Sequence, residues 1–216
     1  MINDPKLVRI NQRNFLRKLS KIKKPYIIDV TGVEITVFPD VFPPRTDTFL
    51  LAENLRVKVG DRILDMATGS GVIAVIAAFK GASGVAVDIN PKAVENANFN
   101  FTKLHLDMKA FVSDTFGNVP KVKFDCIFAI GPYFDEVIKE PIEQAIYGMR
   151  RFMVDLFEKG PEYLKSKGKI LATFPEWSDL SYFEGLINKN KLLYKIIAKR
   201  KTDDGLRVYR LYKVTK

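Results

Sequence analysis

The sequence predicts an α/β fold with a mostly parallel sheet that ends in an antiparallel hairpin. Short apolar runs alternate with segments of helical periodicity, and the runs Ile63–Asp65 and Gly84–Asp88 each precede a helix start. Near the end of the chain, two further runs flank Asp203-Asp204-Gly205, a turn too short for a helical crossover. The 216 residues, 47% of them hydrophobic, suit one main domain with one core.

Residues 1–25 are expected to form a basic helical extension ahead of a single domain over residues 26–216. Residues 1–24 hold eight Lys/Arg against one acid and residues 189–216 hold ten against two, whereas acids exceed cations in between. Four-residue spacing predicts a basic helix face with Arg9, Arg13, Arg17 and Lys21, and an apolar face with Val8, Phe15, Leu19 and Ile22. A solvated surface and a contact surface for nucleic acid or another polyanion are both open interpretations.

The domain is expected to begin with a small hairpin and a helix. Tyr26–Val30 and Glu34–Phe38 read as its two strands around Thr31-Gly32, and a Pro-rich passage follows. A helix then opens, with Thr46 or Asp47 as its cap, and runs toward Gly60.

A glycine turn between Ile63 and Gly71 is the strongest local signal of a ligand site. Backbone N–H groups can approach a ligand there because the residues of the turn are small: Ala67, Gly69, Ser70 and Gly71. Asp65, at the end of the strand, suits an amine or hydroxyl donor better than a phosphate. A plain strand-turn-helix unit uses similar glycines, so the turn needs support from its context.

The rest of the chain supplies that context. The run Gly84–Asp88 places a carboxylate 17 positions after Gly71, near the spacing at which nucleotide-binding folds place an acid on a ribose. The elements expected after it are a helix from Pro91, strands Ala110–Val112 and Phe124–Ala129, a helix from about Glu143 to Leu164, strand Lys169–Phe174, helix Leu180–Ile187, and a hairpin of Leu192–Ala198 and Leu206–Val214.

Several classes of protein are disfavoured. We find no 18-residue apolar run and no secretion signal, so we expect a cytoplasmic protein without a membrane span. The single Cys126 lies in an apolar run and is expected to be buried, which leaves no disulfide and no cysteine metal site. His105 is expected at the surface, whereas Trp177 fits substrate contact and simple packing equally. For Arg150 and Arg151 a solvated face is favoured over anchoring of an acidic substrate.

Five segments carry a family resemblance: Val41-Phe42-Pro43-Pro44-Arg45-Thr46-Asp47-Thr48, Ile63–Gly71, Asp88, Ser113-Asp114 and Ile130-Gly131-Pro132-Tyr133. Together they resemble class I S-adenosylmethionine-dependent methyltransferases, nearest to the release-factor glutamine methyltransferases and rRNA amino methyltransferases of the methyltransferase small domain group. The resemblance spans roughly residues 26–214. It implies a Rossmann-like seven-stranded methyltransferase sheet.

The resemblance also implies a cofactor, S-adenosyl-L-methionine, and no metal. Its implied cofactor-binding residues are Arg45, Thr48, Asp65, Ala67, Thr68, Gly69, Gly71, Asp88, Ile89 and Asp114, and its implied catalytic residues are Ile130, Gly131, Pro132 and Tyr133. Asp88 is suited to accept both ribose hydroxyls and Asp114 the adenine amino group. The methyl group of a sulfonium is transferred in line to a nucleophile, so the protein mainly aligns donor and acceptor.

The chain departs from the family pattern at Ile130. The family carries Asn or Asp there, and that side chain and the next carbonyl hold the target NH2 group. Isoleucine accepts no hydrogen bond, so a buried amino group would lose a partner, at a cost of roughly 1–3 kcal/mol. Either the acceptor is a different nucleophile, such as an oxygen, carbon or ring nitrogen, or Asp135 or Glu136 supplies the polar contact. We favour the changed nucleophile.

These features predict a methyltransferase that acts on RNA or on an RNA-associated or ribosome-associated protein, reached through its basic termini. A small-molecule methyltransferase is an alternative. Because Ile130 replaces the usual Asn/Asp, a catalytically weak module that binds the cofactor or RNA is another. A nicotinamide-dependent dehydrogenase fits less well, because Asp65 lies at the first turn and the sheet closes with a hairpin.

Overall fold

The computed structural model describes residues 5–134 and 148–216. In chain order the elements are α1 (Pro5–Leu19), β1 (Tyr26–Val30), β2 (Val33–Val37), α2 (Thr46–Asn54), β3 (Arg62–Met66), α3 (Val72–Phe79), β4 (Ser83–Asp88), α4 (Pro91–Lys103), β5 (Met108–Val112), β6 (Phe124–Ala129), α5 (Met149–Glu158), α6 (Gly160–Tyr163), β7 (Leu164–Pro175), α7 (Leu180–Lys189), β8 (Leu193–Lys201) and β9 (Val208–Thr215).

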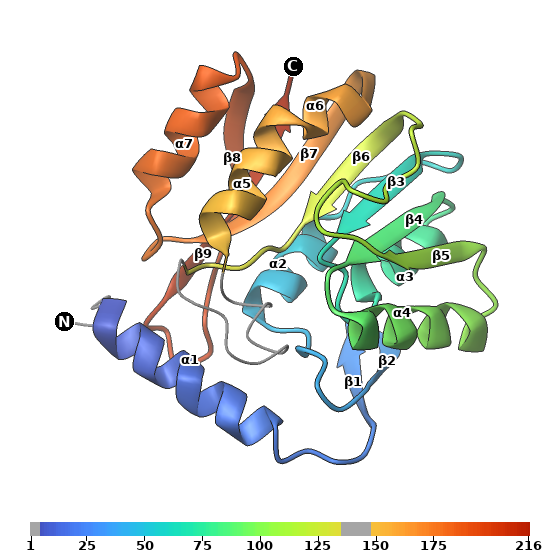
Figure 1. Cartoon of the computed structure of the whole chain (residues 1–216), viewed down its shortest axis with the longest axis vertical. Coiled ribbons are helices and arrows are strands. Elements are labelled where there is room, and N and C mark those ends of the chain that lie inside the picture. Colours follow the sequence, from blue (N-terminus) through green and yellow to red (C-terminus); the bar gives the residue numbers. More distant parts are fainter. Residues whose placement is uncertain (1–4, 135–147) are drawn as a thin grey trace.

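The main sheet of the described residues has seven strands in the order β5-β4-β3-β6-β7-β9-β8 (Figure 1). Strands β5, β4, β3, β6 and β7 pair in parallel, whereas β9 runs antiparallel to both β7 and β8. The β8–β9 hairpin turns at residues 202–207. The predicted α/β fold, with a mostly parallel sheet of seven strands and a closing antiparallel hairpin, is confirmed.

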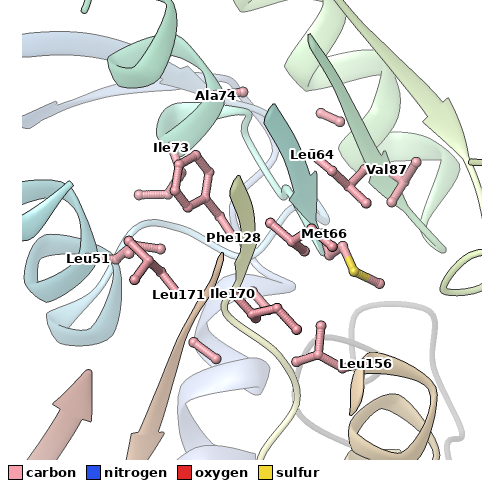
Figure 2. Packing of buried hydrophobic residues seen from close by; sticks show 14 of the residues in the cluster. Leu51, Leu64, Met66, Ile73, Ala74, Val87, Phe128, Leu156, Ile170 and Leu171 are labelled. Atoms are coloured by element: carbon pink, nitrogen blue, oxygen red, sulfur yellow. The ribbon is translucent and has the colours of Figure 1, made fainter. Parts of the chain in front are cut away.

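Helices cover both faces of this sheet. Side chains of adjacent strand residues point to opposite faces, and on β7 Leu171 lies toward Leu51 of α2 whereas Ile170 lies toward Leu156 of α5 (Figure 2). Helix α7 shares the α5 face, because Phe183 packs against Phe157 of α5 with ring centroids 5.1 Å apart. Strands β3, β6 and the second half of β7 are therefore buried on both sides, which explains why they read as apolar runs.

The helical segment expected from about Glu143 to Leu164 is confirmed over most of its described part and is wrong at its C-terminal end. Residues 143–147 lie outside the described residues, α5 ends at Glu158, and the short α6 follows from Gly160. Pro161 has no backbone N–H and its ring crowds the carbonyl one turn earlier, which explains the interruption at Lys159, just before it. Leu164, expected to end the helix, is the first residue of β7 and pairs with Phe124 of β6.

The predicted cap of α2 is also wrong. The N-cap is Arg45, and the helix ends at Asn54 rather than running toward Gly60. The Thr48 hydroxyl accepts a hydrogen bond from the Arg45 backbone N–H at 3.1 Å, while Asp47 Oδ1 accepts the Thr48 N–H at 2.8 Å. Thr48 and Asp47 therefore satisfy the first turn from inside the helix, which leaves the Arg45 side chain available elsewhere.

The β1–β2 hairpin is a separate two-stranded sheet that α4 holds in place. Two fully buried amides of α4, Asn96 and Asn100, each donate to the Thr36 carbonyl at 2.8 Å. Asn100 also donates to the Ser70 carbonyl at 2.8 Å. Because one amide holds both the hairpin and the glycine turn, helix α4 sets the position of the turn.

Helix α1 packs against the domain through its apolar face. Val8, Leu16 and Leu19 are buried, and the Phe15 ring meets the edge of Phe42 at a centroid distance of 5.7 Å. Within the described residues, no helix is both long and apolar enough to cross a membrane. The division of the chain at residue 25 stays a prediction.

Candidate functional site

A cavity of about 230 Å³ lies at the carboxyl ends of the parallel strands. The cavity is lined by residues at the carboxyl ends of four neighbouring strands. These are residues 67–70 after β3, 88–90 at the end of β4, 113–115 after β5 and 130–134 after β6. Carboxyl ends of parallel strands meet at one edge of a sheet, which is where open α/β sheets bind ligands.

The structure brings nearly all the predicted site residues to this cavity. Those that line it are Arg45, Thr48, Asp65, Ala67, Thr68, Gly69, Asp88, Ile89, Asp114, Ile130, Gly131, Pro132 and Tyr133. Gly71 is the exception, because it lies beneath the turn and does not line the cavity. A Cβ there would lie 2.9 Å from the Phe101 ring and 3.0 Å from the Ala97 Cβ, and its φ is +84°. Gly71 therefore serves the close packing of the turn on α4.

Asp65 is buried below the turn and holds it together. Its Oδ2 accepts the Thr68 hydroxyl at 2.6 Å and the Ala74 N–H at 3.3 Å. Burial raises the pKa of this carboxyl to about 7, and the two hydrogen bonds only partly oppose the shift. The Asp65 carboxyl group, which was expected to accept a hydrogen bond from an amine or hydroxyl of a ligand, therefore accepts hydrogen bonds from groups of the protein itself.

This raised pKa predicts that the contribution of Asp65 to the free energy of unfolding falls as the pH rises. The Asp65 carboxyl has a pKa near 4 when unfolded and about 7 when folded, so between these values the folded chain binds the extra proton. The loss should total on the order of 4 kcal/mol between about pH 4 and pH 7. Urea unfolding across this range should show a shallower decline for Asp65→Asn than for the unchanged chain. Equal pH slopes for the two proteins would contradict the assignment.

Asp88 has a partly exposed carboxylate fixed by backbone donors. Its Oδ2 accepts the Gly69 N–H and its Oδ1 the Asn90 N–H, each at 2.9 Å. Burial raises the pKa of Asp88, and the N–H groups of Asn90, Gly69 and Ile89 oppose that shift. A carboxylate accepts about four hydrogen bonds, so both oxygens keep capacity for a ligand.

Asn90 is a site residue that our sequence reasoning missed. Its side chain accepts the Lys92 N–H at 2.9 Å as the N-cap of α4 and donates to the Asp40 carbonyl at 3.1 Å. It therefore joins the end of β4 to the Pro-rich passage, which also contributes to the cavity lining. The Asn90-Pro91 pair was a usable signal, because Asn is favoured at the N-cap and Pro at the first helical position.

Asp114 is exposed and forms an ion pair with Arg151 on α5. One turn further along α5, Asp155 accepts the Thr115 hydroxyl at 2.5 Å. These two contacts hold α5 against the loop after β5, and Arg151 lines the cavity beside Asp114. Arg150 instead pairs with Asp179 at 3.8 Å.

The wall after β6 is apolar where the family pattern has an amide or acid. Ile130 lines the cavity, and the next residue, Gly131, packs against Phe152 of α5. A Cβ at position 131 would lie 2.4 Å from a carbon of the Phe152 ring. Neither Phe152 nor Tyr209, which also line the cavity, carried a sequence signal.

Tyr133 is buried and anchored through its hydroxyl group. That hydroxyl donates to Asp47 Oδ2 at 2.7 Å and lies 3.2 Å from the Thr173 hydroxyl. Burial, and then the charge of Asp47, raise the pKa of Tyr133 well above its ordinary value. The ring meets Trp177 edge-on at 5.9 Å, so its expected stacking on an acceptor stays a prediction.

Three other residues that the sequence singled out do not line the cavity. Trp177 stacks on Phe134 with ring centroids 4.9 Å apart and does not line the cavity, which favours its packing interpretation. His105 is exposed beyond the end of α4, and Cys126 is buried in β6. Asp135 and Glu136, the proposed substitutes for the missing amide, lie outside the described residues.

The lining favours a ligand with positive charge and hydrogen-bond donors. Its described residues include five acids and two cations: Asp40, Asp47, Asp65, Asp88, Asp114, Arg45 and Arg151. The Ser70 hydroxyl is buried without a hydrogen-bond partner and also belongs to the lining, so the wall keeps an unused polar group. This donor set fits a sulfonium cofactor with ribose and amine groups, and it disfavours a phosphate. No group of three metal-ligating side chains occurs in the described ranges.

A family comparison agrees with this geometry. The sequence model of the family described as "Methyltransferase small domain" matches residues 45–176, which is more than half of the chain and includes every strand-end segment of the cavity. The chain belongs to the methyltransferase small domain family. The predicted activity, an S-adenosylmethionine-dependent methyltransferase, is thereby confirmed as a class.

Individual relatives of this methyltransferase differ in what they act on. A protein N5-glutamine methyltransferase of Methanocaldococcus jannaschii is 35% identical over 156 residues, which cover 67% of this chain and 77% of the relative. A tRNA1(Val) (adenine(37)-N6)-methyltransferase of a Flavobacteriaceae bacterium is 31% identical over 71% of this chain and 68% of its own length. The crystal structure of the methyltransferase SMU.776, complexed with SAH, superimposes with a TM-score of 0.67 at 17% identity, over 91% of this chain and 57% of that chain.

Proposed function

We propose that this methyltransferase transfers a methyl group from S-adenosylmethionine to an RNA or to an RNA-associated protein. The observation that carries the proposal is the acidic cavity at the carboxyl edge of the sheet, with the fixed Asp88 carboxylate at one end and the wall from Ile130 to Tyr133 at the other. The expected cytoplasmic location stays a prediction.

The residues of the cavity have separate roles in holding the cofactor. Asp88 accepts the ribose hydroxyls, because its two oxygens are already oriented by the Gly69 and Asn90 N–H groups. Asp114 accepts the adenine amino group, and its ion pair with Arg151 holds that carboxylate in place. The bound cofactor supplies a methyl group on positively charged sulfur, and the acidic lining stabilises that charge.

The wall after β6 selects the acceptor. Ile130 makes no hydrogen bond to a target NH2 group, whereas the Gly131 carbonyl accepts none from the described residues and is free to accept one from a substrate. A single acceptor beside apolar side chains suits a ring nitrogen, an oxygen or a carbon better than a primary amide. The chain's own task is to align that atom and exclude water.

The basic ends of the chain and the relatives both support a substrate associated with RNA. Residues 1–24 and 189–216 carry net charges of +7 and +8 by formal count. Two relatives are named for a protein glutamine and for a tRNA adenine. Ile130 also favours a second candidate, a weak enzyme that binds the cofactor and RNA without efficient transfer.

Transfer of a tritium-labelled methyl group into fractionated RNA, protein and small molecules tests the proposal. We expect label in the RNA or protein fraction. Label confined to small molecules would overturn the substrate class, and cofactor binding without any transfer would favour the second candidate. Ile130→Asn in the same assay should lower transfer to the native acceptor, because the new amide favours an NH2 group. Higher transfer to that acceptor would contradict the changed nucleophile.

A further inference from the structure

We propose that a cleft between helix α1 and the β8–β9 hairpin binds the phosphate backbone of an RNA substrate beside the methyl-transfer cavity. This inference rests on the proposed function and narrows its substrate class to RNA. The cleft is lined by Asn11, Asn14, Phe15, Lys18, Arg45 and Arg207. Figure 1 shows α1 beside the turn that joins β8 and β9.

The cleft adjoins the methyl-transfer cavity through Arg45. This residue lines both hollows, because it lies at the start of α2 between the Pro-rich passage and α1. Its guanidinium group stacks 4.1 Å from the centre of the Phe15 ring. A phosphate held in the cleft would therefore place the neighbouring nucleotide near the mouth of the cavity.

The charge of the cleft is positive in its described lining. Three cations and two amides line it, and no acid does. Lys18 forms no ion pair with the described residues, whereas Arg207 is paired with Asp204 at 3.4 Å. Cations that the fold does not neutralise are available to a polyanion.

Helix α1 holds its part of the cleft firmly. Leu16 and Leu19, which directly follow Phe15 and Lys18, are buried against the domain. The Phe15 ring also packs on the Phe42 ring, with centroids 5.7 Å apart. Phe42 itself lines the methyl-transfer cavity. The positions of the cleft cations are thus coupled by direct packing to the wall of that cavity.

RNA fits this surface better than an acidic protein does. The cleft joins the two most basic segments of the chain, the N-terminal helix and the last hairpin. A surface with several positive charges matches a nucleic acid, which carries one negatively charged phosphate per nucleotide. Phe15, which is partly exposed in the lining of the cleft, also offers an aromatic surface on which an unpaired base can stack.

The cleft is an addition to the family's common core. The family model covers residues 45–176, so apart from Arg45 every residue of the cleft lies outside it. The cavity can therefore keep its cofactor chemistry while the cleft determines what substrate is presented to it.

The test is the salt dependence of binding to a fluorescently labelled single-stranded RNA, followed by anisotropy. The double variant Lys18→Gln/Arg207→Gln should bind about 10-fold more weakly. The slope of log affinity against log salt should become shallower by about 0.7 to 1.4, because Lys18 has no ion pair within the described part of the chain whereas Arg207 must exchange Asp204 for a phosphate. Lys58→Gln/Lys80→Gln is the matched control, because it removes two exposed charges that lie outside both hollows. It should change RNA affinity less than about twofold.

Three outcomes would overturn the inference: unchanged RNA binding by the cleft variant, an equal loss in the control, or competition by polyglutamate as strong as that by RNA. Calorimetric titration of both variants with S-adenosylmethionine distinguishes failure of the RNA-binding cleft from failure of the proposed function. Loss of RNA binding with unchanged cofactor affinity supports the cleft. If the unchanged chain failed to bind the cofactor, the proposed function would be wrong. The RNA-binding measurement would still test the cleft independently.

Discussion

Replacing Asp88 with alanine is expected to weaken S-adenosylmethionine binding at least about 100-fold, or roughly 3 kcal/mol. The variant removes a charged acceptor suited to two ribose hydroxyls, and charge-assisted hydrogen bonds are among the strongest in proteins. It also leaves the Gly69 and Asn90 N–H groups without the carboxylate that they share at 2.9 Å. The turn and the start of α4 would therefore lose a common anchor beside the ligand. Isothermal titration calorimetry measures the change directly.

Asp107→Ala is the matched control for this experiment. Asp107 is exposed beyond α4 and does not line the cavity, so its removal should leave cofactor affinity within about twofold. Thermal unfolding of both variants shows whether a loss of affinity follows from a loss of structure. An Asp88→Ala protein that binds the cofactor as tightly as the control does would refute the ribose assignment.

The largest effect on stability is expected from Gly84→Ala. Gly84 lies in β4, between β3 and β5, with a φ of +155°, and a Cβ there would lie 2.0 Å from the Ile63 carbonyl oxygen. The clash involves the backbone of the neighbouring strand, so no side-chain movement relieves it. We expect a loss of more than about 4 kcal/mol, a large part of the stability of a typical domain. Asp65 lies next to the last residue of β3 and Asp88 ends β4, so the cofactor site should be lost too.

Gly185→Ala offers a comparison with the opposite expected sign. Gly185 lies in α7, and a Cβ there meets nothing within 4 Å. Because alanine loses less backbone entropy in a helix, this variant should gain about 0.5–1 kcal/mol. Urea unfolding of soluble protein, or the soluble fraction on expression, checks both variants. A Gly84→Ala protein within about 1 kcal/mol of the unchanged chain would disprove the backbone clash.

The strand ends were predictable because each depends on local chemistry. Asp65 and Asp88 each end an apolar run, and parallel strands bring their carboxyl ends to one edge whatever the loops between them do. The small residues Ala67 and Gly69 mark a backbone that approaches a ligand. Gly71 belongs to the same motif but packs on α4. A glycine in a sequence indicates that something approaches the backbone closely, but it does not tell whether the neighbour is a ligand or another part of the protein.

Contacts between distant segments were not predictable in this way. Arg151 on α5 pairs with Asp114, and Tyr133 donates to Asp47 across 86 positions of the chain. No local pattern specifies such partners, since they depend on how α5 and α2 pack on the sheet. The break just before Pro161 did have a local signal, because proline disrupts a continuing helix.

The amino-acid sequence by itself determined the class of fold, the family and the cofactor edge, because periodicity and short motifs depend on residues that are close in the chain. Tertiary structure alone decided which side chains face one another across the cavity. It also brought Lys18 of the N-terminal helix and Arg207 of the last hairpin to one cleft beside Arg45. The physical reason is that packing of α1 and pairing of β8 with β9 join segments almost 190 residues apart, and no local propensity encodes such a distance.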